Sequence, residues 1–196
     1  MNTIVVVIFF GILTHAFGNF AGITECQQVT AMNGFDPNKF FKGTWHMTNV
    51  HNGLFSIVCQ DLETEIKKGK LIIEYNYNKS GKEHTVHCES NGQEQNGVIP
   101  FNCKIKSLRF FKLLNQVTEF QANFKIMTTD YNDYALLYKC VTLKSGTKAD
   151  NYVVLRRSKS DYNIPGSVQS FLQINGVSLK NCKELINADD INIEVI

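Results

Sequence analysis

The stretch FFKGTWHMTNV, from Phe40 to Val50, organises the rest of the chain. Gly43 suits a tight entry into a strand, where a side chain would crowd the neighbouring backbone. Trp45, the only tryptophan, opens an alternating, β-prone run, and one large indole there is suited to plug one end of a small barrel. Upstream, Asp36 and Pro37 fit the N-cap and first position of a short N-terminal 3-10 turn. A Gly-x-Trp alone is common, so the interpretation depends on the other segments of the chain.

Eight short β-rich segments come after this opening, most of them separated by tight turns. They span residues 46–50, 60–67, 70–77, 83–88, 98–107, 117–128, 134–143 and 151–157. A run of short antiparallel strands with no helices between them indicates an all-β fold, either a closed up-and-down barrel or a sandwich.

The sequence pattern changes from β-strand to helix after Arg157. A C-terminal α-helix is expected to begin near Pro165, capped by Asp161 or Asn163. Its apolar positions follow a 3.6-residue period and are Val168, Phe171 and Leu172. The residues from 187 onward are typical of a loose tail.

Composition points to an exported globular protein. Of the 196 residues, 43% are hydrophobic and 19% are charged, and a net charge of +2 argues against nucleic acid or an acidic membrane surface as partner. Residues 1–18 have the pattern of a signal peptide, whose apolar core over 4–13 is too short to span a bilayer. We therefore expect cleavage before Asn19, one domain over 19–196, and no membrane attachment. A closed barrel has no free strand edges, so we expect a monomer.

The cysteines are predicted to form structural disulfides and not a metal site or a catalytic site. All six come after the predicted signal, and an even count in an exported chain indicates three disulfides, with 15 pairings open. There is no Cys-x-x-Cys pair and no Gly-x-Ser-x-Gly elbow. We therefore predict neither a metal site nor an enzyme.

Taken together, these residues resemble the lipocalins. That family has a Gly-x-Trp on its first strand, here Gly43 and Trp45, a Thr-Asp-Tyr turn, here at 129–131, and an arginine on its last strand, here Arg157. The longer matches over 35–45 and 129–137 are similar to the salivary lipocalins of blood-feeding triatomine bugs, in the triabin, pallidipin and procalin group. The resemblance implies an eight-stranded antiparallel up-and-down barrel, with structural roles for Gly43, Trp45, Asp130 and Arg157. Arg157 would cover Trp45 in a cation–π contact, and Arg156 would point to the opposite face.

The resemblance also implies the disulfides and bears on haem. The implied pairs are Cys26–Cys140, Cys59–Cys182 and Cys88–Cys103, with Cys26–Cys59 as a rival pairing. The related nitrophorins hold haem through a His within a Tyr-His-Tyr segment, and the matching segment here has Asn76 between Tyr75 and Tyr77. No cofactor is therefore expected, although His84 and His87 on the next strand remain alternative ligands.

The barrel interior is the expected ligand site. Strand alternation and the resemblance together nominate nine residues, each of which is alternatively a plain core residue: Met47, Asn49, His51, Tyr75, Asn76, Phe120, Phe124, Tyr134 and Tyr138. The two signals conflict on the 70–77 strand, where alternation favours Tyr75 inward and the alignment favours Asn76. Asn78 begins an Asn-Lys-Ser glycosylation sequon at a hairpin tip.

The resemblance implies three candidate functions. The first is a secreted salivary protein that blocks platelet aggregation by sequestering a small host mediator, such as the eicosanoid thromboxane, with its carboxylate held by Arg109, His51, Gln116 or Lys125. As variants of this function, a biogenic amine would use Asp61, Glu63 or Glu83, and ADP would use Lys104, Lys106, Arg109 and Lys112. The second is a protein-binding inhibitor of a clotting protease, with the apolar segment 108–114 as its contact surface. The third is a relative without specific activity.

Overall fold

The computed structural model describes residues 22–51, 59–79, 82–92, 95–107 and 118–183. The predicted signal peptide, the apolar segment 108–114 and the tail from residue 187 lie outside the described residues. Arg109, Lys112 and Gln116 lie outside them as well.

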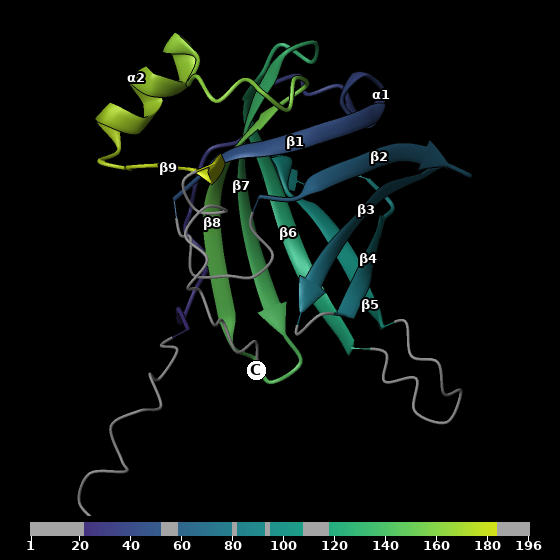
Figure 1. The fold of residues 1–196 in the computed structure, drawn as a ribbon. Coiled ribbons are helices and arrows are strands. Elements are labelled where there is room, and N and C mark those ends of the chain that lie inside the picture. The colour runs from purple at the N-terminus through teal and green to yellow at the C-terminus, as the bar shows by residue number, and fades with distance from the viewer. Residues whose placement is uncertain (1–21, 52–58, 80–81, 93–94, 108–117, 184–196) are drawn as a thin grey trace, which may run out of the picture.

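Eight antiparallel strands close into a barrel (Figure 1). The first strand, β1, is hydrogen-bonded to β8 on one side and to β2 on the other, and this double pairing closes the sheet. A two-residue strand, β9, adds to the second half of β1. The strands are β1 (Gly43–Val50), β2 (Asp61–Lys67), β3 (Lys70–Lys79), β4 (Lys82–Ser90), β5 (Ile99–Ser107), β6 (Thr118–Thr129), β7 (Tyr134–Leu143), β8 (Lys148–Arg156) and β9 (Lys180–Asn181).

The segment before β1 is a short α-helix, α1 (Pro37–Phe40), and not the 3-10 turn that we predicted. The N–H of Phe41 donates to the carbonyl of Pro37, four residues back, at 2.8 Å. The Asp36 side chain caps the helix by accepting from the N–H of Asn38. The expected cap and proline positions are therefore correct, and only the helix type differs.

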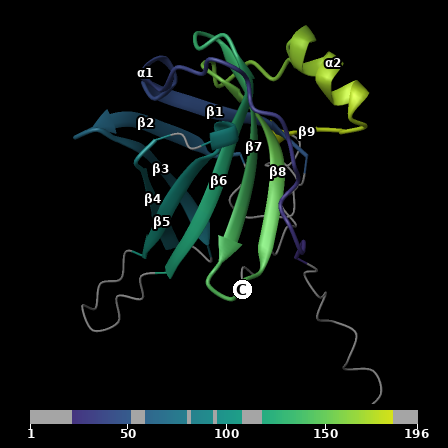
Figure 2. The same cartoon turned by 180° about the vertical axis from the view of Figure 1, so that it is seen from behind.

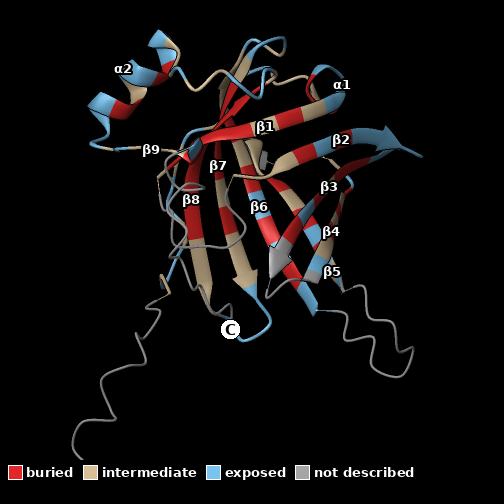
Figure 3. Ribbon diagram, in the orientation of Figure 1, coloured by how far each residue is buried: buried red, intermediate tan, exposed pale blue. Residues whose placement is uncertain are grey.

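The second helix, α2 (Gly166–Ile174), lies outside the barrel beside β7 and β8 (Figure 2). Its buried residues are Val168 and Leu172, as the 3.6-residue period predicts, and Figure 3 shows their face as the buried side of the helix. The expected cap is wrong, because Pro165 occupies the N-cap position without a side-chain hydrogen bond. Neither helix in the described part of the chain is long and apolar enough to cross a membrane.

Arg157 and Trp45 close one end of the barrel. Trp45 is fully buried, and the guanidinium carbon of Arg157 lies 3.6 Å from the centre of its indole ring. Arg157 donates to the carbonyls of Thr44 and Phe40, and Trp45 donates its indole N–H to the same Phe40 carbonyl. Gly43, with φ of 75°, lets the chain turn from α1 into β1 directly beneath the guanidinium.

The turn between β6 and β7 joins this closed end. The Asp130 carboxylate accepts from the backbone N–H groups of Asn132, Asp133 and Tyr134. Tyr131 adopts a φ of 66°, and its hydroxyl accepts from the N–H of Asp36 at 3.0 Å. Asp130 therefore holds the turn in a shape that places Tyr131 against the start of α1.

Three disulfides are present, in the pairing that the resemblance implies: Cys26–Cys140, Cys59–Cys182 and Cys88–Cys103. The first fastens the N-terminal arm to the outer wall at β7, and the second fastens β9 to the start of β2. The third bridges directly paired residues of β4 and β5. Cross-links that close long loops restrict the unfolded chain most, by about 2–4 kcal/mol each.

We expect Arg157→Met to lower the free energy of unfolding by about 2–3 kcal/mol, because it removes the cation–π contact and two charge-assisted hydrogen bonds to carbonyls. Urea titration followed by the fluorescence of Trp45 measures the change. Lys159→Met is the matched control, since Lys159 is 72% exposed and should shift stability by only about 0.5 kcal/mol. Equal effects of the two substitutions would show that Arg157 does not stabilise the closed end.

Candidate functional site in the barrel interior

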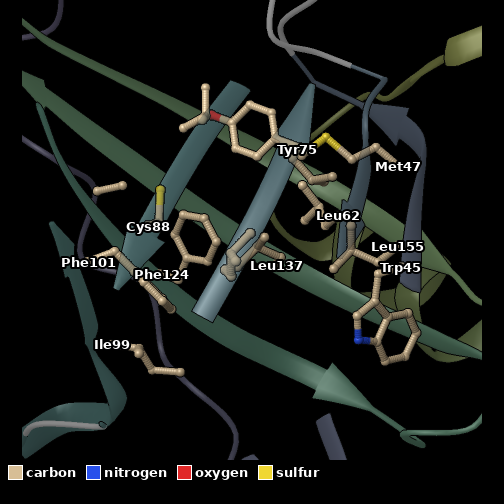
Figure 4. Close-up of a cluster of buried hydrophobic side chains, with 14 of the residues drawn as sticks. Trp45, Met47, Leu62, Tyr75, Cys88, Ile99, Phe101, Phe124, Leu137 and Leu155 are labelled. Atoms are coloured by element: carbon tan, nitrogen blue, oxygen red, sulfur yellow. The ribbon is translucent and has the colours of Figure 1, made fainter. Parts of the chain in front are cut away.

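The barrel interior is lined mainly by apolar side chains. Figure 4 shows side chains from different strands pointing toward a common centre, among them Leu62, Phe101, Phe124, Leu137 and Leu155. These residues share one face because directly paired residues of antiparallel strands point to the same side of the sheet. Phe120 and Phe124 of β6, which alternation predicted to face the interior, are buried there, and Ala122 and Ile126 share their face.

One cation interrupts this lining. Lys139 lies on β7 between Leu137 and Val141, and its register partner Phe124 is buried in the core. The Lys139 ammonium nitrogen lies 6.0 Å from the centre of the Phe124 ring and 5.7 Å from that of Tyr75. The ammonium therefore sits between two aromatic rings inside the barrel, in cation–π geometry.

Lys139 extends across the barrel. Tyr75 lies on β3, and in the strand order β3 and β7 are separated by four steps in either direction around an eight-stranded barrel. The two strands thus form opposite walls, and their side chains meet near the axis. Toward the closed end lie Leu137 and Trp45, while toward the other end the interior carries Tyr77, Phe120 and Val141. Lys139 therefore lies between the residues near the Trp45 end and those toward the opposite end.

Burial tunes the charge of this group. Desolvation in the apolar interior lowers the pKa of Lys139 to about 8. Burial raises the pKa of the Tyr75 hydroxyl, with a smaller contribution from Tyr77, and burial also raises the pKa of Tyr77, so that both phenols stay neutral near neutral pH. Among the described side chains, the inner faces of the strands carry no Asp or Glu, so no carboxylate neutralises the ammonium there.

The outer wall fixes the strand that carries Lys139. The residues on either side of it, Tyr138 and Cys140, point outward. The Tyr138 hydroxyl donates to Asp150 at 2.8 Å and accepts from the N–H of Gln27 at 2.6 Å, and Cys140 is bonded to Cys26. These contacts with the N-terminal arm hold the base of Lys139 facing inward.

The nominated ligand residues divide into two groups. Met47, Tyr75, Phe120 and Phe124 are buried in the interior cluster, and their role in ligand binding stays a prediction. Asn49 and His51 are not in the interior, because β1 shifts register between Met47 and Asn49. After this bulge, Asn49 pairs with Val154 of an outer cluster, and His51 contacts the outer-face Tyr152 and pairs its ring nitrogen with the carbonyl of Ser178.

Asn76, Tyr134 and Tyr138 are also outside the interior. Asn76 is exposed, since Tyr75 and Tyr77 take the inner positions of β3, so alternation predicted this strand correctly and the alignment did not. The Tyr134 hydroxyl is hydrogen-bonded to Ser167 at the start of α2. Tyr138 belongs to the outer cluster described above. The bulge on β6 between Ile126 and Thr128 likewise turns Thr128 outward, to pair with Leu136.

The charged residues nominated for ligands that fall within the described ranges lie on the outer wall. Asp61 pairs with His46 and Lys159, and, although burial opposes it, these contacts lower its pKa. Glu63 lies opposite Glu74 in the backbone register of β2 and β3. Lys104 forms an ion pair with Glu119. Lys125 donates to the carbonyl of Val29 in the N-terminal arm. These groups do not converge on the interior.

Metal and haem have little support in the described residues. No group of three His, Cys, Asp or Glu side chains in the described ranges is placed to hold a metal ion. His84 stacks on Tyr77 with ring centres 5.0 Å apart, and His87 binds Glu74 and Glu89 on the outer wall. The absence of haem stays a prediction, as does a glycan on Asn78, whose backbone pairs with Glu83 beside the β3–β4 turn.

Sequence reasoning missed Lys139, although a signal was present. On the strand from 134 to 143, the two hydroxyls of Tyr134 and Tyr138 drew attention to the even-numbered face. Cys140 shares that face and binds the N-terminal arm, which runs along the outer wall beside β8 (Figure 2). The implied disulfide therefore places even residues outward and Lys139 inward.

Comparison with known proteins supports this architecture. The sequence profile of the Triabin family matches residues 13–171. Triabin from Meccus pallidipennis is 34% identical over 162 residues, which cover 82% of this chain and 94% of triabin.

Two solved structures have the same fold. The crystal structure of LTBP1 in complex with LTC4 is 27% identical and superposes with a TM-score of 0.58, covering 78% of this chain and 88% of LTBP1. The tryptamine complex of the amine-binding protein of Rhodnius prolixus has a TM-score of 0.62 over 83% of this chain and 88% of its own, but at 18% identity the likeness shows the fold alone. A match over most of the length, together with the closed barrel, establishes that this chain belongs to the triabin family of lipocalins.

Proposed function

We propose that this protein is a secreted salivary scavenger that holds a small apolar host mediator bearing a carboxylate, of the eicosanoid class, and thereby impairs platelet aggregation. The single observation that carries the proposal is the Lys139 ammonium between two aromatic rings in a mainly apolar interior. An eicosanoid has the matching chemistry, since it joins a long hydrocarbon chain to one carboxylate.

The physical argument is that the anion completes the site. A buried charge without a partner is costly, whereas a hydrogen-bonded ion pair offsets much of that cost. Among the described residues, no hydrogen bond or ion pair involves the Lys139 ammonium. A ligand carboxylate would supply the missing partner, while its chain would lie against Phe120, Tyr77 and Val141 toward the end opposite Trp45.

Relatives add support of a coarser kind. The structure of LTBP1 with LTC4 shows that a barrel 27% identical to this one holds a leukotriene. A biogenic amine fits the interior less well, because its ammonium would meet Lys139 without a carboxylate on the described inner faces. The contact surface for a clotting protease, nominated at 108–114, lies outside the described residues and stays a prediction.

Binding of a long-chain carboxylate should depend on pH through Lys139. We expect arachidonate to bind with nearly constant affinity below about pH 7, because the ammonium is then charged. With a pKa of about 8, the association constant should fall about 30-fold between about pH 7 and pH 9.5. Tyr75, Tyr77 and His84 also face the interior, and burial raises the pKa of both phenols, so the phenols do not cause this decline. Isothermal titration calorimetry across this range measures the change.

Three controls make this test specific. Lys139→Met should weaken arachidonate binding at least about tenfold and remove the pH dependence, whereas Lys139→Arg should retain binding and move the decline above pH 10. Arachidonyl alcohol has the same chain without the carboxylate, so its affinity should be unaffected by pH. Arachidonate binding that is equally tight in wild type and Lys139→Met would overturn the proposal.

The same substitution should raise stability. At pH 7 the folded protein must keep a charged ammonium in an apolar interior, and Lys139→Met removes that cost, so we expect the variant to melt at a higher temperature than wild type without ligand. Between about pH 8 and pH 10.5 the unfolded chain binds more protons than the folded one, so wild-type stability rises with pH relative to the variant. Calorimetric melting temperatures at several pH values measure this difference. If Lys139→Met and wild type melt at the same temperature at pH 7, the ammonium is well solvated and burial does not destabilise the folded protein.

A further inference from the structure

Lys139 combines three properties that favour covalent chemistry. Its amine lies inside a barrel, it is partly accessible rather than fully enclosed, and no described carboxylate faces it to hold its proton. A lysine desolvated in an apolar pocket is the arrangement that makes this side chain a nucleophile. Carboxylate binding requires the protonated ammonium of Lys139. The neutral amine, which is the other protonation state of the same group, can act as a nucleophile.

We propose that the Lys139 amine captures small aliphatic aldehydes inside the barrel as imines, which makes the protein a trap for lipid-derived carbonyl compounds. The inference shares with the proposed function the premise that small apolar molecules enter the interior. It differs in the ligand class, an aldehyde rather than a carboxylate, and in the covalent bond.

The reaction balances without an added reagent. The lone pair of the neutral amine attacks the aldehyde carbon, forming a C–N bond, and a proton moves from nitrogen to the former carbonyl oxygen. The C–O bond then breaks, and the hydroxyl leaves with the remaining N–H proton as water while the nitrogen lone pair forms the C=N bond, so that one aldehyde and one amine give one imine and one water. The apolar rings of Phe124 and Tyr75 flank the nitrogen and limit the approach of water, which slows hydrolysis of the imine.

Selectivity over surface lysines results from protonation. With a pKa of about 8, about a tenth of Lys139 is neutral near pH 7. A solvated lysine with a pKa of about 10.4 is neutral in well under one molecule in a thousand. The neutral fraction of Lys139 is therefore about 200-fold larger than that of a surface lysine. The apolar interior would also concentrate an aldehyde that has an apolar chain.

The test uses n-decanal, a saturated aldehyde that cannot add through a conjugated double bond. The full-length mature protein is incubated with one equivalent of decanal and cyanoborohydride near pH 7, and intact mass followed by peptide mapping locates the decyl group. We expect one decyl group on Lys139. Lys139→Arg, which keeps the positive charge but cannot form an imine, should lose this adduct and react at least about tenfold more slowly.

Lys125→Arg is the matched control, because Lys125 lies on the outer wall with its amine bonded to the carbonyl of Val29. This variant should label as wild type does. Labelling spread over surface lysines, or equal labelling of wild type and Lys139→Arg, would overturn the inference.

Decanoate binding separates this inference from the proposed function. Wild type that binds decanoate but does not trap decanal would show that the imine inference is wrong while carboxylate binding stands. Wild type that traps decanal at Lys139 but does not bind decanoate would support the imine and count against the proposed function. If both are correct, Lys139→Arg binds decanoate and fails to trap decanal.

Discussion

The stacking of Arg157 on Trp45 is the constraint on which the rest of the barrel depends. The guanidinium covers the indole and is bonded to two carbonyls at the junction of α1 and β1, so the start of the first strand is tied to the end of the last. The β6–β7 turn reaches the same place through Tyr131 and Asp36. One end of the barrel is thus filled by an aromatic and its cation, and the interior residues that remain available to a ligand are those toward the opposite end.

The wall that carries Lys139 is held from outside. Tyr138 and Cys140 are engaged by the N-terminal arm through a hydrogen bond and a disulfide, and Asp150 accepts the Tyr138 hydroxyl. These contacts are made away from the interior, yet they determine which way residue 139 points. A site whose supporting residues are fixed in advance loses less entropy on binding, so under the proposed function the arm would favour ligand binding without touching the ligand.

Much of the fold was predictable, and the failures have local physical causes. Strand spacing alone left a barrel and a sandwich open, and the barrel was predicted through the resemblance to the lipocalins at the Gly-x-Trp, the Thr-Asp-Tyr turn and the final arginine. Each of these fills a backbone or packing role that few other residues fill. Ligand residues were predicted by counting alternate positions, and that count fails wherever an extra residue enters a strand. The bulge after Met47 turned Asn49 and His51 outward, and the bulge after Ile126 did the same to Thr128. Neither site has a glycine or proline that would have revealed the bulge in the sequence.

The position of Lys139 gives the proposed ligand site a physical basis for distinguishing guests by charge. In water, two unit charges about 4 Å apart interact by about 1 kcal/mol, but the same pair near a protein surface interacts by about 4 kcal/mol. Tyr75 and Phe124 present ring faces that attract the ammonium without neutralising it. An anion entering this interior gains the full attraction, whereas a cation meets repulsion with no carboxylate on the described inner faces to offset it. Under the proposed function, the apolar walls would favour a guest with a long hydrocarbon chain, and one lysine would favour a guest with negative charge.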